Sequence, residues 1–312
     1  MMVVYAKPGA LQRTLDTLPA GDEPIEVRLE AGTYREKCTL SRAHVTLCGA
    51  GAEKTRIVWD DGAFALLPDG MKRGTFRTAT LMVDAPHITL RHLTVQNEAA
   101  PRETAGQAVA LYADGDGFTC EDCRLLSFQD TLFTAPLPPK EIEKNGFIGP
   151  KQFAPRVPQR HTYRRCLIAG DVDFIFGGAA AWFEDCELRS VDGRSDRTAP
   201  YVGYVTAAST PEGQAYGYVF RRCRFTHEGL PAGSVYLGRP WRSYAKTLLV
   251  DCWLGEHIHP DGFHDWNKRD AHGTIAYAEC RSYGPGAGKN RAPFVRLTDG
   301  ADVRYEAFMA SL

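Results

Sequence analysis

Short cysteine-bearing segments recur through the middle of the chain and restrict the folds that it can adopt. Each segment has an apolar residue, about two polar residues, a cysteine, a polar residue and usually another apolar residue. The segments are residues 119–125, 163–168, 183–188, 220–225, 250–254 and 278–281. Irregular repeats of about 20 to 45 residues that contain short alternating β segments are typical of a solenoid. Helical periodicity is almost absent from this region, so the pattern favours strands.

Parallel pairing of successive coils would bring equivalent residues about 4.8 Å apart, so that cysteine stacks on cysteine. Further β-like segments are residues 25–29, 44–47, 55–59, 80–83, 87–95 and 108–112. We therefore expect an all-β parallel β-helix with six cysteines in an inward-facing ladder. Cys120 and Cys123 form the single C-x-x-C spacing, and disulfides or a metal are weaker interpretations of this pattern. The thiols are expected to be reduced.

The chain is expected to form one domain over residues 1–312, with a short cap at each end. Residues 1–24 would form the first cap, because Leu11, Leu15 and Leu18 have helical spacing. Residues 300–312 would form the second, with Val303, Ala307, Phe308 and Leu312 on one face. Residues 134–160 are rich in proline and interrupt the β pattern, so we expect a long loop that forms one wall of a cleft.

Composition excludes several classes of protein. A formal charge of −1 with 24% charged residues argues against a nucleic-acid-binding surface. No run approaches the roughly 18 apolar residues that span a membrane, and the first residues lack the pattern of a signal peptide. We therefore expect a cytoplasmic monomer without nucleic-acid or membrane partners. His257 and His259 are too few for a metal site and are expected at the surface, so we predict neither a metal nor a cofactor.

Asp173 lies in a run, residues 171–177, that otherwise is typical of a buried strand. An ionised carboxylate is costly to bury without partners. Taken alone, the run favours a structural aspartate that caps a turn after Gly170. Two other stretches favour a functional role, because Gln129 precedes a second carboxylate, Asp130, and Arg239 lies beside an aromatic residue.

Stacking of adjacent coils would place Asp130 and Asp173 in one site. Like charges at close range separate two titrations, so that one carboxylate stays ionised and the other keeps a proton. Arg239 is the natural counter-ion for Asp173, and the amides of Gln107 and Gln129 are donors that suit an oxyanion. These groups together favour acyl transfer. Glycoside hydrolysis by the two carboxylates is an alternative that has less need of the cation and the amides.

Five motifs in order give the chain a resemblance to the pectin methylesterase (pectinesterase) family. The motifs are residues 74–80, 106–111, 129–132, 173–177 and 236–241. The resemblance covers the chain from about Gly32 to the C-terminus. It implies a right-handed, single-stranded parallel β-helix and metal-free hydrolysis of the C6 methyl ester of galacturonate in pectin or its oligosaccharides.

The resemblance also implies a role for each matching residue. Asp173 would be the nucleophile and Asp130 the general acid and then the base, while Gln129 and Gln107 hold the oxyanion. Arg239 would position Asp173. The residues expected to contact substrate are Thr80, Val172, Phe176 and Trp241. Two positions depart from the family pattern, with Gly178 in place of Asn and Phe133 in place of Tyr.

Three alternatives remain open on the sequence alone. The same site could hydrolyse another small carbohydrate or acyl ester. A non-catalytic carbohydrate-binding β-helix could keep the cleft without its chemistry. A glycan hydrolase or lyase could use the same scaffold. The joint presence of the two aspartates, the two glutamines and the arginine favours the esterase.

Overall fold

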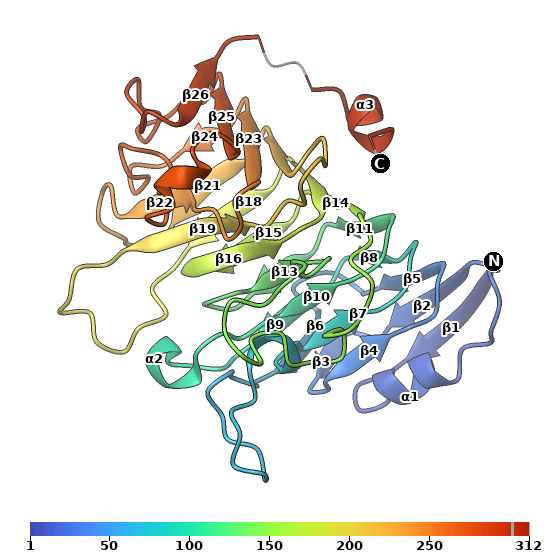
Figure 1. Ribbon diagram of the computed structural model, residues 1–312. Helices are drawn as coiled ribbons and strands as arrows, with labels where there is room; N and C mark the ends of the chain where they lie inside the picture. The colour runs from blue at the N-terminus through green and yellow to red at the C-terminus, as the bar shows by residue number, and fades with distance from the viewer. Residues whose placement is uncertain (301–302, 312) are drawn as a thin grey trace.

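The computed structural model describes residues 1–300 and 303–311, and the chain winds through three sheets, A, B and C (Figure 1). Sheet A contains β1 (Met2–Ala6), β2 (Ile25–Leu29), β5 (Val45–Cys48), β8 (Thr89–Arg91), β11 (Phe118–Glu121), β14 (Arg160–Arg164), β17 (Ala180–Glu184), β20 (Tyr218–Arg221), β23 (Lys246–Val250), β25 (Ala276–Cys280) and β26 (Val295–Thr298). Sheet B contains β3 (Gly32–Tyr34), β6 (Thr55–Trp59), β9 (Thr94–Asn97), β12 (Arg124–Leu126), β15 (Leu167–Gly170), β18 (Glu187–Ser190), β21 (Arg224–His227) and β24 (Trp253–Leu254). Sheet C contains β4 (Cys38–Leu40), β7 (Leu81–Val83), β10 (Leu111–Ala113), β13 (Leu132–Thr134), β16 (Val172–Gly177), β19 (Gly203–Ala208) and β22 (Val235–Gly238).

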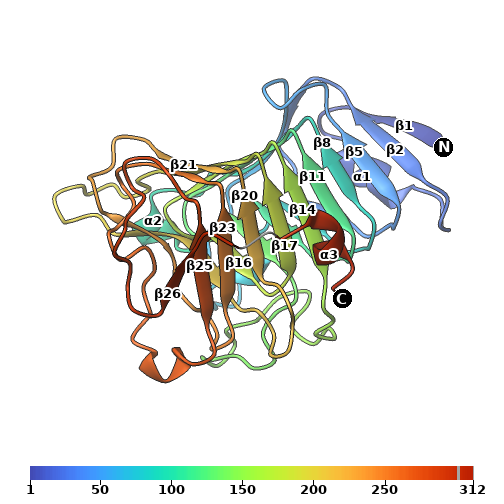
Figure 2. The ribbon, with the colours of Figure 1, turned by 90° about the horizontal axis from the view of Figure 1, so that it is seen from above.

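Each full coil contributes one strand to each sheet, and neighbouring coils pair in parallel. Figure 2 shows the strands of sheet A side by side along the axis of the solenoid. The register places like residues above one another, as where Tyr163, Phe183 and Phe220 are partners on three successive strands. Their ring centroids are 4.6 and 4.5 Å apart, so the rings form a continuous stack inside the solenoid. The predicted parallel β-helix is confirmed.

The cysteine ladder is real, but its membership differs from the prediction. Five cysteines directly follow a residue with positive φ at the corner between sheets A and B, and they are Cys123, Cys166, Cys186, Cys223 and Cys252. Cys280 precedes the corner residue Arg281 and lies opposite Val250, so Ser282 occupies the position of the ladder in that coil. Cys120 lies within β11, opposite Tyr163. All nine cysteines are free in this structure.

The two ends of the chain differ from the expected helical caps. Residues 1–24 contain the strand β1 as well as α1 (Leu11–Asp16), which buries Leu11 and Leu15 over the first coil. Near the other end, α3 (Tyr305–Met309) lies on the outer face of sheet A (Figure 2), with Phe308 5.4 Å from the Trp182 ring. The helix therefore covers a flank of the solenoid, because Trp182 offers an apolar face there. Residues 301, 302 and 312, part of the predicted second cap, lie outside the described residues.

The remaining helices are short. They are α2 (Arg102–Ala105) and the 3₁₀ turns Thr75–Arg77 and Arg269–Ala271. Within the described ranges, no helix combines the length and the apolar character needed to cross a membrane.

Candidate active site

Both candidate aspartates have a backbone conformation that aims the side chain away from the regular strand pattern. Asp173 has a φ of 50° and lies in a β-bulge, where the pairing of β16 with β19 shifts between Val172 and Ile175. Asp130 has a φ of 65°, two residues before β13 begins. Aspartate adopts this left-handed conformation more readily than most residues. Bulges are common beside active sites because they redirect a side chain.

Arg239 binds Asp173 through two parallel hydrogen bonds. Its Nε donates to Oδ1 at 2.9 Å and its Nη2 donates to Oδ2 at 2.7 Å. The guanidinium lies between two aromatic rings, 3.9 Å from the centroid of Tyr204 and 3.8 Å from that of Trp266. Sequence reasoning missed both rings, because neither belongs to a motif. Stacking on two faces and bidentate pairing together fix the plane of the arginine.

The two aspartates have different electrostatic surroundings. Burial raises the pKa of Asp173, but hydrogen bonding and charge from Arg239 oppose that shift. The pKa of Asp130 is raised well above its usual range, first by burial and then by the nearby charge of Asp173. Asp173 is therefore the stronger acid of the pair. Asp130 therefore holds its proton more strongly than Asp173, which is the order expected of two carboxyl groups that share a site.

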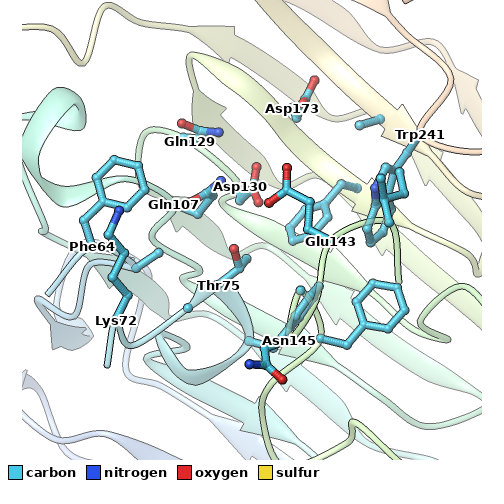
Figure 3. A pocket seen from close by; sticks show the side chains of 18 of the residues that line it. Phe64, Lys72, Thr75, Gln107, Gln129, Asp130, Glu143, Asn145, Asp173 and Trp241 are labelled. Carbon is cyan, nitrogen blue, oxygen red and sulfur yellow. The ribbon is translucent and has the colours of Figure 1, made fainter. Parts of the chain in front are cut away.

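A cavity of about 500 Å³ brings most of the predicted site residues together (Figure 3). Its lining includes the predicted residues Gln107, Gln129, Asp130, Asp173, Phe176, Arg239 and Trp241. Gln107 and Gln129 lie on neighbouring coils, which a hydrogen bond from the Ala108 amide to the Gln129 carbonyl joins at 3.0 Å. Both side-chain amides line the cavity that contains Asp130, and amide N–H groups are donors of the kind that can stabilise an oxyanion.

Thr80 and Val172 are not among the described residues that line this cavity. Thr80 is fully buried, and its hydroxyl donates to the Gln96 carbonyl at 3.0 Å. The Val172 side chain is also buried, while its carbonyl accepts a hydrogen bond from the Asp130 amide at 3.1 Å. These contacts position neighbouring backbone, and a contact of either side chain with substrate stays a prediction.

The proline-rich loop forms one side of the cavity. Phe147 lies 5.8 Å from Phe76 and 6.2 Å from Trp241, measured between ring centroids. Arg242 fastens the loop from the other side, because its Nη2 donates to the Lys140 carbonyl at 3.0 Å. Phe76 belongs to the sequence motif of residues 74–80, whereas Phe147 belongs to no motif. The loop thus adds an aromatic wall that its sequence did not predict.

The expectation that His257 lies at the surface is wrong. Its side chain is fully buried and stacks on His227 with centroids 4.6 Å apart, and the burial lowers its pKa to about 3. A neutral imidazole packs there as an aromatic ring. His259 is half-buried against Tyr236. Across residues 1–300 and 303–311, no group of three or more histidine, cysteine, aspartate or glutamate side chains is placed to hold a metal ion.

A third buried carboxylate, Asp171, lies outside the cavity lining. It is fully buried, and its Oδ2 is 2.9 Å from the Nε of Arg102, the first residue of α2. Burial raises the pKa of Asp171 to about 6, against the opposing charge of Arg102. The ion pair joins the start of β16 to the segment that leads into Gln107.

Replacing Asp171 by Asn should change how stability depends on pH. The folded-state pKa of about 6 lies above the unfolded value of about 3.9, so the folded protein binds this proton more tightly between those values. This group therefore lowers the free energy of unfolding of the wild type as pH rises from about 4 to 6, by about 3 kcal/mol at most. In Asp171→Asn the free energy of unfolding should no longer show this fall, because the amide does not titrate. Denaturant titrations of both proteins at several pH values would test it, and parallel curves would contradict it.

The three parallel sheets and the cleft beside sheet C define the class of protein, which is that of the parallel β-helix proteins with a polar cleft on one sheet. Within that class, the chain belongs to the Pectinesterase family, whose model matches residues 9–137 and 156–296. The interval between the two matched stretches, residues 138–155, falls in the proline-rich loop. The predicted family is thereby confirmed, and the loop is the part of the cleft that the family model does not describe.

Curated relatives from plants agree with this family. The chain is 28% identical over 287 residues to putative pectinesterase 11 of Arabidopsis thaliana, covering 90% of this chain and 68% of the relative. It is 32% identical over 274 residues to pectinesterase 1 of Citrus sinensis, covering 86% of this chain and 41% of the relative. The chain therefore spans less than half the length of the Citrus protein.

Solved structures agree with the fold. The pectin methylesterase of Erwinia chrysanthemi matches with a TM-score of 0.78 and 26% identity, covering all of this chain and 97% of the other. A pectin methylesterase in complex with a hexasaccharide matches with the same score, identity and coverage. The expected right-handed parallel β-helix is confirmed.

Proposed function

We propose that the protein removes C6 methyl esters from galacturonate units of pectin or pectic oligosaccharides and releases methanol. The observation that carries the proposal is the bidentate Arg239–Asp173 pair beside Asp130, whose pKa is strongly raised, in the same cavity as Gln107 and Gln129. Family membership and a solved relative in complex with a hexasaccharide support the choice of substrate.

The first half of the proposed reaction forms a covalent acyl-enzyme. A carboxylate oxygen of Asp173 attacks the ester carbonyl carbon, and the resulting oxyanion accepts hydrogen bonds from the Gln107 and Gln129 amides. The bond from the carbonyl carbon to the methoxy oxygen then breaks. Asp130 gives its proton to that oxygen, and methanol leaves. The galacturonate carbonyl remains attached to Asp173 as an anhydride.

In the second half of the reaction, Asp130 acts as a general base instead of a general acid. Now ionised, Asp130 takes a proton from a water molecule as the water oxygen attacks the galacturonate carbonyl carbon. The bond to Asp173 breaks, and this carboxylate returns to its pair with Arg239. The products are one free galacturonate carboxyl group and a reprotonated Asp130, so the cycle consumes one ester and one water.

Methanol release measured together with chain length tests this proposal. An esterase releases methanol from methylated pectin and leaves its chain length unchanged. A glycan hydrolase or lyase shortens the chain, and a binding module does neither. An acetylated pectin without methyl esters distinguishes hydrolysis of another ester. Absence of methanol from every methylated substrate would contradict the proposal.

The protein should act on short methylated oligogalacturonides at least as well as on polymer. The loop anchored through Phe147 and Arg242 forms one side of the cavity, and we expect it to limit the number of sugar rings that contribute binding energy to catalysis. We expect kcat/KM per ester on trimers to hexamers to equal or exceed that on high-molecular-weight pectin, and removal of residues 140–149 to raise activity on polymer. A clear preference of the intact protein for polymer would contradict this expectation.

The proposal extends to the compartment in which the protein acts. Nine free cysteines suit a reducing compartment, so we propose a monomer that acts in the cytoplasm without nucleic-acid or membrane partners. Short substrates taken up after cleavage outside would be available there. Fractionation of the native source would test this, since recovery of the protein from the medium would contradict it.

A further inference from the structure

A hairpin at the end of the cavity opposite Trp241 presents an aromatic ring together with an ammonium group (Figure 3). Phe64 and Lys72 both line the cavity and both are exposed. An antiparallel bridge between Leu66 and Lys72 closes the hairpin. The Nζ of Lys72 lies 4.6 Å from the centroid of the Phe64 ring. The ring and the cation therefore form one surface.

The hairpin is fixed to the segment that carries Gln107. The Ala63 amide donates to the Gln107 carbonyl at 2.9 Å, and the Phe64 amide donates to the Ala105 carbonyl at 3.0 Å. Gly106 has a φ of 70°, and a Cβ at this position would lie 2.7 Å from the Phe64 ring. Only glycine meets both conditions without strain. The Phe64–Lys72 surface is therefore held in a fixed position relative to the candidate oxyanion donor.

Lys72 is free to pair with a ligand. The adjacent Arg73 is 3.0 Å from Asp61, and Lys37 is 2.6 Å from the same carboxylate. Lys72 makes no such ion pair within residues 1–300 and 303–311. The Lys72 ammonium contacts the Phe64 ring at the cavity, whereas Arg73 and Lys37 pair with a carboxylate.

We propose that Phe64 and Lys72 form a subsite for a galacturonate unit whose carboxyl group is free. The aromatic ring would pack on the apolar face of the sugar, and the ammonium would pair with the C6 carboxylate. A methyl ester at this position has no charge and would lose the ion pair. The inference rests on the proposed function and deepens it, because it predicts that the preferred ester has an unesterified unit on the side of Gln107.

Binding to an inactive protein separates this inference from turnover. In an Asp173→Asn background, calorimetry would compare an unesterified galacturonate hexamer with a fully methylated one at low ionic strength. Lys72→Gln should weaken binding of the unesterified hexamer by roughly three- to fivefold, as expected of one partly exposed charge pair, and leave the methylated hexamer unchanged. Phe64→Ala should weaken both. Added salt should remove the effect of Lys72→Gln.

Lys54→Gln is the matched control, because this exposed lysine is not among the residues that line the cavity. It should bind both hexamers as the parent does. An equal effect of Lys72→Gln on both hexamers, or none on either, would overturn the subsite. Failure of the wild type to release methanol would instead contradict the proposed function, while the binding comparison would still decide whether the subsite exists.

Discussion

Asp173→Asn should abolish turnover while the solenoid remains folded. The amide has nearly the shape of the carboxylate but is a poor nucleophile, so we expect kcat to fall by roughly 10⁴-fold or more. The side chain would keep one oxygen toward Arg239 and lose the second of the two hydrogen bonds that now reach it at 2.9 and 2.7 Å. Methanol release under saturating substrate gives kcat, and thermal unfolding confirms that the variant is folded.

Asp171→Asn supplies the matched control for this result. It makes the same chemical change two residues earlier, at a buried carboxylate that is not among the described residues lining the cavity. This variant should keep the greater part of wild-type turnover. Retention of more than about a tenth of the activity by Asp173→Asn would show that this carboxylate is not the nucleophile.

Arg239→Lys should cost about two orders of magnitude in kcat/KM. A lysine ammonium cannot donate two parallel hydrogen bonds or stack flat between Tyr204 and Trp266, whose centroids lie 3.9 and 3.8 Å from the guanidinium. A weaker ion pair lowers the pKa of Asp173 less, while burial still raises it, so the pKa of Asp173 should rise further. Because the nucleophile must be ionised, the acid limb of the kcat/KM profile should move to higher pH.

Arg242→Lys tests whether any cation near Trp241 has this effect. The Arg242 guanidinium lines the same cavity but donates to the carbonyls of Trp241 and Lys140 instead of a carboxylate. Its replacement should reduce activity modestly without moving the acid limb. If Arg239→Lys were kinetically silent, or lost activity with an unchanged pH profile, the arginine would have a structural role alone.

The sequence by itself determined the solenoid and most of the cavity's reactive groups. In a parallel β-helix each coil pairs with its sequence neighbours, so local alternation and the recurrence of Cys166, Cys186 and Cys223 already predict which residues stack. Asp173 was found because a carboxylate interrupts an otherwise apolar strand, Asp130 because it follows an amide, and Arg239 because it lies beside an aromatic residue. Asp130 and Asp173 lie on adjacent coils and Arg239 lies two coils beyond Asp173, so the repeat brings all three to the same side of sheet C.

Only the tertiary structure decided what surrounds those groups. Loops leave the repeat, so nothing periodic in the sequence places Phe147 or Lys72 at the cavity or Trp266 against Arg239. The position of a residue relative to the corner of its coil also depends on the structure: Cys280 precedes the corner residue Arg281 instead of following it, and therefore falls outside the cysteine ladder. Periodic pairing fixes the backbone of the coils, whereas the walls of the cleft depend on long-range contacts between loops, and these contacts have no period that a sequence can show.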